Sequence, residues 1–184
     1  MTGDEQAAFA RLLAETEIRG QLARYARSVD RRDWEAVRDC YFHDAEDWHG
    51  AYRGGRDGFI EWVRARHAGT KRAVHFLGNM HFEWLSPASA LVETYFIALK
   101  READPQDNGG RSRDDMVIGR YLDHFEQRAG RWAVAAREVV YDLTQKSWAE
   151  GDEPAMVGQL GRRDSRDPFY SMLLRLDPAP AGRR

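Results

Sequence analysis

The spacing of the apolar residues changes once along the chain, near Lys71, from a helical repeat to an alternating one. Upstream, residues such as Ile18, Leu22 and Val29 recur three or four positions apart, which places them on one face of a helix. Downstream, apolar and polar residues alternate in stretches rich in β-branched and aromatic side chains, which is typical of strands. The chain is therefore expected to fold as an α+β protein, with early helices covering a later sheet.

Three helices are predicted in the first part of the chain. The first spans 4–29, and its predicted buried stripe comprises Phe9, Leu12, Leu13, Ile18, Leu22, Tyr25 and Val29. The second follows an N-cap at Asp33 and continues to Tyr41. The third spans 56–68, and a short strand over 45–51 precedes it.

Four strands are predicted after Lys71, at 71–84, 91–100, 116–126 and 132–143. Apart from a loop over 103–112, their connections are short, so the sheet is expected to be antiparallel. On the first strand, alternation separates two faces: Val74, Phe76, Met80, Phe82 and Trp84 on one, and His75, Leu77, Asn79 and His81 on the other.

A sheet curved around the three helices would form a cone-like barrel with one open mouth. This domain is expected to occupy residues 1–145. Residues 146–184 lose clear periodicity and are expected to form a partly irregular arm that packs on the sheet or on a neighbouring subunit.

Length, composition and net charge limit the classes of protein to which this chain can belong. The chain has 184 residues, 42% of them hydrophobic, which suits one domain with a substantial core. The formal net charge of -2 provides no field to attract nucleic acid or an anionic membrane. No apolar run approaches the ~20 residues of a bilayer span, and the acidic N-terminus lacks a signal-peptide pattern, so a cytoplasmic location is expected.

No metal or cofactor is expected from the motifs. The single Cys40 excludes an internal disulfide and a cysteine-ligated metal cluster. His43 and His49 lie near acidic residues but without a known ligand spacing, so they are interpreted as surface residues. The chain also lacks a Gly-rich phosphate loop and a Gly-x-Ser-x-Gly elbow.

Asp30 and His75 are the main candidates for catalysis. Asp30 lies where the first helix ends, so it is either a cap for the next helix or a carboxylate aimed into a cavity. A carboxylate bonded to one imidazole nitrogen fixes the tautomer and raises the basicity of the other nitrogen. We therefore predict that Asp30 and His75 face each other across the cone within ~2.6–3.2 Å and form a general base.

Tyr25 and Arg137 are candidates with two interpretations each. Tyr25 either packs in the core or offers its hydroxyl to a substrate oxygen. Arg137 shares a strand face with apolar residues, so it needs either a ligand or an ion-pair partner such as Glu93 or Asp123. The sequence leaves both alternatives open.

Three segments, 18–44, 73–79 and 121–137, resemble the SnoaL-like proteins of the nuclear-transport-factor-2-like superfamily. The resemblance implies a cone-like α+β barrel related to cofactor-independent lyases: bile-acid 7α-dehydratase, hexachlorocyclohexane dehydrochlorinase and scytalone dehydratase. It implies catalytic roles for Asp30, His75, Tyr25 and Arg137. The candidate substrate-binding residues are Leu77, Asn79, Phe96, Val117 and Tyr121. The second strand histidine of scytalone dehydratase has no counterpart here, because Tyr95 or Phe96 occupies the matching region.

The leading hypothesis is a lyase that removes water or another leaving group from a small hydrophobic ring substrate. Isomerisation or cyclisation would use the same initial proton abstraction. The alternative is a non-catalytic binding or assembly subunit resembling the β subunits of ring-hydroxylating dioxygenases. The apolar face of the first predicted strand also indicates a homo-oligomer, for which the resemblance suggests a trimer and otherwise a dimer.

Overall fold

The computed structural model describes residues 2–103, 112–149 and 158–176. The helices are α1 (Gly3–Arg31), α2 (Trp34–Arg38), α3 (Arg56–Arg66) and α4 (Pro168–Leu176). The strands are β1 (Tyr41–His49), β2 (Tyr52–Gly55), β3 (Thr70–Ser86), β4 (Ser89–Ala103), β5 (Ser112–Arg128) and β6 (Arg131–Ala149). Within these residues no helix is both long and apolar enough to cross a membrane.

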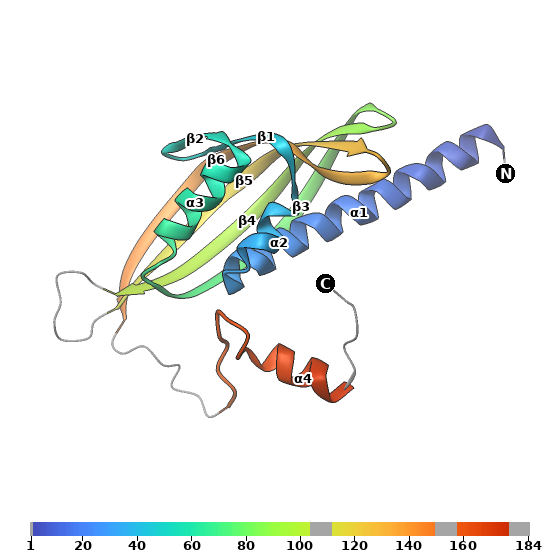
Figure 1. The fold of residues 1–184 in the computed structure, drawn as a ribbon. Coiled ribbons are helices and arrows are strands. Elements are labelled where there is room, and N and C mark those ends of the chain that lie inside the picture. The colour runs from blue at the N-terminus through green and yellow to red at the C-terminus, as the bar shows by residue number, and fades with distance from the viewer. Residues whose placement is uncertain (1, 104–111, 150–157, 177–184) are drawn as a thin grey trace.

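The strands form one six-stranded sheet in the order β2-β1-β6-β5-β4-β3 (Figure 1). The meander from β3 to β6 is antiparallel, as predicted. However, β1 pairs with β6 in parallel, so the sheet is mixed and the prediction of a purely antiparallel sheet is wrong. Local periodicity does not encode this pairing, because its direction depends on how the intervening chain crosses the sheet.

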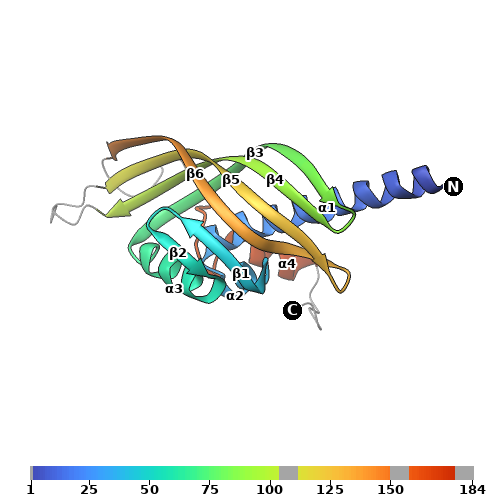
Figure 2. The ribbon, with the colours of Figure 1, turned by 90° about the horizontal axis from the view of Figure 1, so that it is seen from above.

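The helices α1, α2 and α3 lie on one side of the curved sheet, and the sheet stays open at its two edge strands (Figures 1 and 2). The core between the layers includes Ile18 and Leu22 from α1, Phe59 from α3, Phe125 from β5 and Trp132 from β6, all buried. The α+β class and the cone-like arrangement are thus confirmed.

Helix α1 begins at a capping box, in which the Thr2 hydroxyl accepts from Glu5 N and the Glu5 carboxylate accepts from Thr2 N. It ends at Arg32, which has a left-handed backbone with φ 57°. The predicted buried stripe is only partly correct, because burial begins at Ala14 and the first apolar residues, Phe9, Leu12 and Leu13, are exposed. Figure 2 shows the reason: the N-terminal part of α1 projects beyond the sheet.

Helix α2 is shorter than predicted. Asp33 caps it as expected, by accepting a hydrogen bond from Ala36 N, but the helix ends at Arg38. Tyr41, which helical spacing assigned to α2, is instead the first residue of β1. There its hydroxyl donates to the buried Asp47 at 2.8 Å, so tertiary contacts override the local repeat.

A β-bulge in the middle of β3 reverses the predicted faces of its second half. The pairing with β4 shifts between Leu77 and Met80, so that Gly78 and Asn79 together oppose one residue of β4. Beyond the bulge, Met80, Phe82 and Trp84 pack against the core, on the same side of the sheet as His75. The prediction that these three side chains share the outer face of Val74 and Phe76 is therefore wrong.

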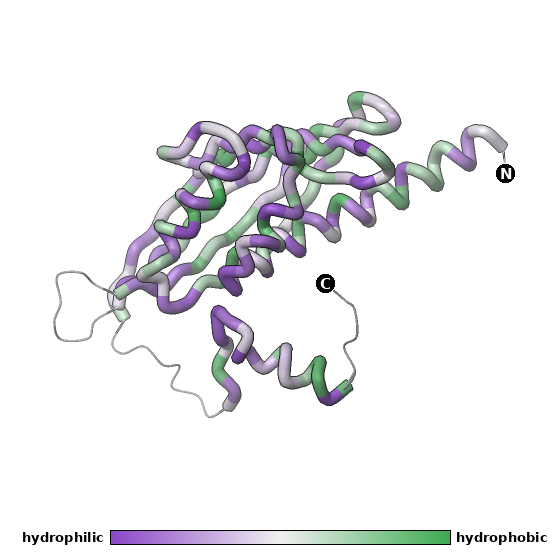
Figure 3. Tube along the Cα trace, viewed as in Figure 1, coloured by the Kyte–Doolittle hydropathy of each residue, from purple (hydrophilic) through white to green (hydrophobic). Residues whose placement is uncertain are grey.

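The described part of the C-terminal arm contacts the end of α1 and the start of β3. Arg72 of β3 donates to Gly161 O at 3.0 Å, and Arg31 pairs with Asp167 at 3.1 Å. Helix α4 lies beside α1, where the Arg27 guanidinium carbon is 4.7 Å from the Phe169 ring, and Figure 3 shows hydrophobic stretches along α4. Strand β6 runs to Ala149, past the end predicted for the strand. Most of the predicted 103–112 loop, and residues 150–157 and 177–184 of the arm, lie outside the described residues.

Candidate active site

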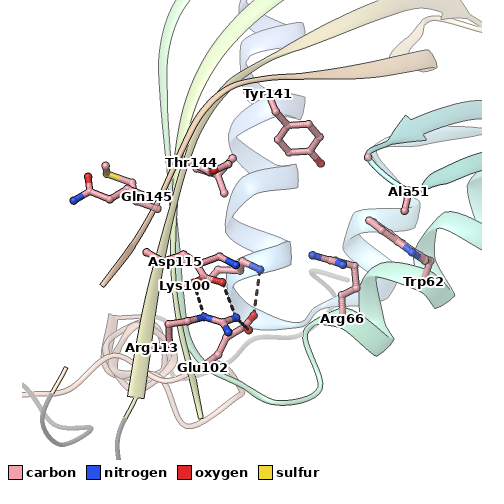
Figure 4. Close-up of a pocket in the computed structure, with 14 residues that line it drawn as sticks. Ala51, Trp62, Arg66, Lys100, Glu102, Arg113, Asp115, Tyr141, Thr144 and Gln145 are labelled. Atoms are coloured by element: carbon pink, nitrogen blue, oxygen red, sulfur yellow. Dashed lines mark hydrogen bonds and ion pairs between the residues drawn. The ribbon is translucent and has the colours of Figure 1, made fainter. Parts of the chain in front are cut away.

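An inner chamber of about 100 Å³ lies between α3 and the inner face of the sheet. Its wall includes His49, His67, His75, Phe96, Val117 and Tyr121. A larger outer chamber of about 420 Å³ adjoins it (Figure 4). The two chambers share five lining residues, Trp62, Arg66, Lys100, Val117 and Tyr141, which we call the neck.

Asp30 and His75 form the contact that the sequence predicts. The Oδ1 atom of Asp30 lies 2.6 Å from Nδ1 of His75, and Oδ2 accepts from the His75 backbone N–H at 2.9 Å. The side chains are only 14% and 10% exposed, respectively. Because an ionised carboxylate only accepts hydrogen bonds, Nδ1 carries the proton of neutral His75 and Nε2 keeps its lone pair.

The role of Asp30 as a helix cap is excluded by its geometry. Asp33 caps α2, whereas both carboxylate oxygens of Asp30 bond to His75. Asp30 can reach β3 because it lies in the last turn of α1, which ends one residue later at Arg31 and contacts that strand. The chain thus holds the imidazole at two points, on the ring and on the backbone.

Arg137 forms an ion pair with Asp123, which was one of the two alternatives left open by the sequence. Its Nε and Nη2 donate to the carboxylate of Asp123 at 2.6 and 2.8 Å, and both side chains are fully buried. The two residues face each other across β5 and β6. Burial opposes the charge of Arg137, but the Asp123 carboxylate, together with Tyr41 and Tyr25, keeps the pKa of the guanidinium well above its usual value.

Tyr25 lies behind the chamber wall and not in it. Its ring is buried, 4.1 Å from the Arg137 guanidinium carbon and edge-on to Tyr121 at 5.8 Å. Burial raises the pKa of its hydroxyl above the ordinary value. Neither Tyr25 nor Arg137 borders the inner chamber, whereas Tyr121, which contacts both, does. The structure therefore does not bring the four predicted catalytic residues to one surface.

The predicted substrate-binding residues divide in the same way. Phe96, Val117 and Tyr121 border the inner chamber, and the rings of Phe96 and Tyr121 stack at 4.3 Å. Leu77 packs against the core without bordering the chamber. Asn79 lies in the β3 bulge and is exposed, so the structure places it away from the chamber.

Sequence reasoning missed two histidines of the chamber wall. His49, interpreted as a surface residue, stacks on Phe59 at 5.2 Å, and its Nδ1 lies 3.5 Å from the buried Asp47. His67 at the end of α3 had no supporting pattern. His43, in contrast, is exposed as predicted. In the part of the chain that the structure describes, no three His, Cys, Asp or Glu side chains are grouped to hold a metal ion.

The outer chamber is lined by charged residues from the sheet on one side and by α3 on the other (Figure 4). On the sheet, Glu102 pairs with Lys100 at 3.2 Å and with Arg113 at 3.1 Å. On α3, the Arg66 guanidinium carbon lies 5.0 Å from the ring of Trp62. The outer chamber is therefore polar, whereas the inner one combines aromatic rings with imidazoles.

The chain was compared with protein families, curated proteins and solved structures. Residues 10–138 match the family of SnoaL-like domains, and no curated protein matches the chain. A scytalone-dehydratase-like protein from Novosphingobium aromaticivorans shares 18% identity at a TM-score of 0.67, over 80% of this chain and 97% of its own. A hexachlorocyclohexane dehydrochlorinase from Novosphingobium barchaimii LL02 shares 16% at 0.69, over 80% and 99%. An aromatic-ring-hydroxylase-like protein from Novosphingobium aromaticivorans shares 22% at 0.61, over 73% and 92%. At these identities the likeness establishes the fold alone.

Proposed function

The chain belongs to the SnoaL-like domain family, and on that premise we propose that it is a cofactor-independent lyase whose reaction begins when His75 removes a proton from a substrate carbon. The substrate is a small hydrophobic ring compound. The observation that carries the proposal is the hydrogen bond between Asp30 and His75 at the wall of a chamber. Isomerisation and cyclisation remain within the proposal, because they start with the same proton transfer.

Asp30 makes His75 a competent base in two ways. By accepting from Nδ1, it fixes the tautomer in which Nε2 has a free lone pair. When Nε2 takes the proton, the ring becomes a cation, which the Asp30 charge stabilises. The electron pair of the broken C–H bond forms the new double bond, and the leaving group departs with its own bonding pair. General base catalysis of this kind contributes about 10²–10⁴-fold.

We propose that the hydroxyl of Tyr121, and not that of Tyr25, donates a hydrogen bond to the substrate. Burial raises the pKa of Tyr121 well above its ordinary value, although the charge of Arg137 opposes the shift, so the hydroxyl stays protonated as a donor. The Arg137 guanidinium carbon lies 4.3 Å from the Tyr121 ring. Tyr25 and Arg137 therefore act in the proposal by holding Tyr121 and not by touching the substrate.

The chamber volumes indicate how a substrate would lie. A cavity of about 150 Å³ accommodates benzene, so the inner chamber, at about 100 Å³, holds only the reacting part of a ring. The remainder would extend past the neck into the outer chamber of about 420 Å³. Its polar substituents would there meet Arg66 and Lys100.

The proposal is tested by two substitutions in a protein shown to be folded. Ring-containing hydroxy compounds are screened by thermal shift, and those that stabilise the protein are assayed for turnover. His75→Ala is expected to abolish turnover, because it removes the base. Asp30→Asn is expected to leave a small residual rate, because it only misaligns the base and disfavours its cation.

A fully active His75→Ala variant would contradict the general-base mechanism.

Added chelator is expected to leave the rate unchanged, since the proposal involves no metal. Loss of activity with chelator would direct attention to His49 and the neighbouring Asp47.

The second candidate function is a non-catalytic binding or assembly subunit. The observation in its favour is the small volume of the inner chamber, about 100 Å³ between packed aromatic side chains. A protein of this kind would bind ring compounds with equal affinity before and after His75→Ala and would turn none of them over.

A further inference from the structure

A second imidazole borders the same inner chamber as His75. His67 is the C-cap residue of α3, directly after Arg66, and is 7% exposed. It enters the chamber from the helix side, whereas His75 belongs to the sheet. The mechanism derived above does not use it.

Arg163 of the C-terminal arm decides which nitrogen of His67 carries the proton. Nη2 of Arg163 lies 2.8 Å from Nδ1 of His67. A guanidinium has only donors, so Nδ1 must accept, and the neutral ring then carries its proton on Nε2. Among the residues that the structure describes, no protein group is hydrogen-bonded to that Nε2.

Arg163 is itself held by three carbonyl groups. Its Nε donates to Asp30 O at 2.8 Å, Nη2 to Val29 O at 3.0 Å, and Nη1 to Thr70 O at 3.0 Å. The first two belong to the last turn of α1, where unpaired carbonyls and the helix dipole favour a cation. One guanidinium thus connects the helix end that carries Asp30 with His67.

The surroundings also keep His67 neutral. Burial lowers its pKa to about 2, and the positive charge of Arg163 acts in the same direction. The other groups that disfavour its protonation are Lys100 on β4, His75 on β3 and Arg32 after α1. At physiological pH the ring is therefore a neutral donor through Nε2.

We propose that His67 is a second catalytic residue, which donates a hydrogen bond from Nε2 to a carbonyl oxygen of the substrate, and that Arg163 is its positioning residue. The inference rests on the proposed function and specifies its substrate class: a ring compound with a carbonyl group next to the carbon that loses its proton. When His75 takes that proton, the C–H electron pair forms a carbon–carbon double bond and the carbonyl π pair moves to oxygen. A neutral imidazole can stabilise the resulting enolate oxygen without protonating it.

The two histidines thus receive opposite roles from opposite partners. His75 faces an acceptor, Asp30, and becomes the base. His67 faces a donor, Arg163, and becomes the electrophile. Arg163 lies beyond residues 10–138, the part of the chain that matches the family, so in this chain the arm completes the site.

The tautomer is tested first, without any substrate, by long-range ¹H–¹⁵N spectra of the full chain labelled with ¹⁵N-histidine. His67 is expected to be protonated on Nε2 only and to show no titration between about pH 5 and pH 8. In Arg163→Met, a tautomer with the proton on Nδ1 should appear, because the donor that holds Nδ1 as an acceptor is gone. Arg166→Met is the matched control, because Arg166 belongs to the same arm but pairs with the exposed Asp164. A wild-type His67 that is protonated on Nδ1 or that titrates in this range would overturn the assignment.

The donor role is tested with 4-nitrophenolate, a planar ring that carries an oxyanion. His67→Leu is expected to weaken its binding about 10-fold or more, whereas His67→Gln, whose side-chain amide can donate from a similar place, should retain most of it. Equal affinity of the wild type and His67→Leu, or no binding to the wild type, would overturn the donor role.

With a turned-over substrate, His67→Leu should lower kcat about 10²–10³-fold and His67→Gln less. If His75→Ala remains active, the proposed function fails, but the spectra still show which nitrogen of His67 carries the proton. If His75→Ala is inactive and His67→Leu is fully active, only the further inference fails.

Discussion

Single residues acquire their chemistry here from one or two neighbours. His75 and His67 are both imidazoles that border the inner chamber, yet a carboxylate at 2.6 Å and a guanidinium at 2.8 Å place their protons on different nitrogens. Arg137 shows the complementary case, because Asp123 satisfies two of its donors and the rings of Tyr25 and Tyr121 enclose it. A buried, paired cation of that kind holds its surroundings in place, and among the described residues its Nη1 has no hydrogen-bond partner.

His67 makes the stability of the protein depend on pH. Its folded-state pKa is about 2, lowered by burial, whereas the unfolded chain has the ordinary value near 6.5. Below that value the unfolded state binds a proton that the folded state does not bind, so stability is present above about pH 6.5 and is lost as the pH falls. The free energy of unfolding should decrease by about 2 kcal/mol between about pH 7.5 and pH 5.

Urea denaturation at the two pH values measures this loss. His67→Gln removes the titrating group, so that variant should lose about 2 kcal/mol less than the wild type over the same interval. The control is His81→Gln, because His81 is an exposed residue of β3. An identical pH dependence for His67→Gln and the wild type would contradict the low pKa.

Among the elements, strands β5 and β6 lie close together at Gly119. A Cβ atom at this position would collide with Val140 O and would lie 3.0 Å from the Phe96 ring. The register between the two strands also shifts here, since Ile118 pairs with Leu143 and Gly119 with Tyr141. The strand therefore requires glycine for space, next to a residue of the inner chamber wall.

Gly119→Ala is accordingly expected to destabilise the protein by about 1–3 kcal/mol, because backbone or Phe96 must move. Gly20→Ala is the matched control: Gly20 lies in exposed α1 with no atom within 4 Å of its missing Cβ. Gly20→Ala should raise the free energy of unfolding by about 0.5–1 kcal/mol. Chemical denaturation measures both, and a Gly119→Ala variant as stable as the wild type would show that the close contact relaxes without cost.

At the scale of the whole molecule, an apolar band crosses the outer face of the sheet. The register aligns Phe76 of β3, Ile97 of β4, Ile118 of β5 and Leu143 of β6 in one row. Phe76, Ile97 and Leu143 are 59%, 39% and 55% exposed. The described arm contacts α1 and the start of β3, so it leaves this band open. Contiguous apolar surface of this kind marks an interaction site.

We therefore expect the protein to form a homo-oligomer through this band, a trimer or otherwise a dimer. Burying the band removes apolar surface from water, which contributes about 25 cal/mol per Å². Ile97→Glu should shift the protein to the monomer in sedimentation velocity at micromolar concentration. His81→Glu is the control, because His81 is exposed on β3 outside the band. A monodisperse wild-type monomer would mean that the band does not drive self-association.

Features that depend on a repeat within one element could be predicted from the residues alone. The helical spacing of Ile18, Leu22 and Val29 predicts α1, and alternation predicts the four strands of the meander. The position of Asp30 at a helix end and of His75 on a strand, together with the family resemblance, predicted a contact that the structure confirms. The position of Asp33 likewise predicts a helix cap that the structure confirms.

Local patterns did not predict several features whose partners are far apart along the chain. The parallel pairing of β1 with β6, the ion pair that occupies Arg137, and the bulge that turns Met80 inward all depend on contacts between elements. His67 is the clearest case, because its partner Arg163 lies 96 residues further on. A local repeat indicates which face of an element is buried, but not which side chain from a distant segment will contact that face. In this chain, such long-range contacts determine which nitrogen of each chamber histidine carries the proton.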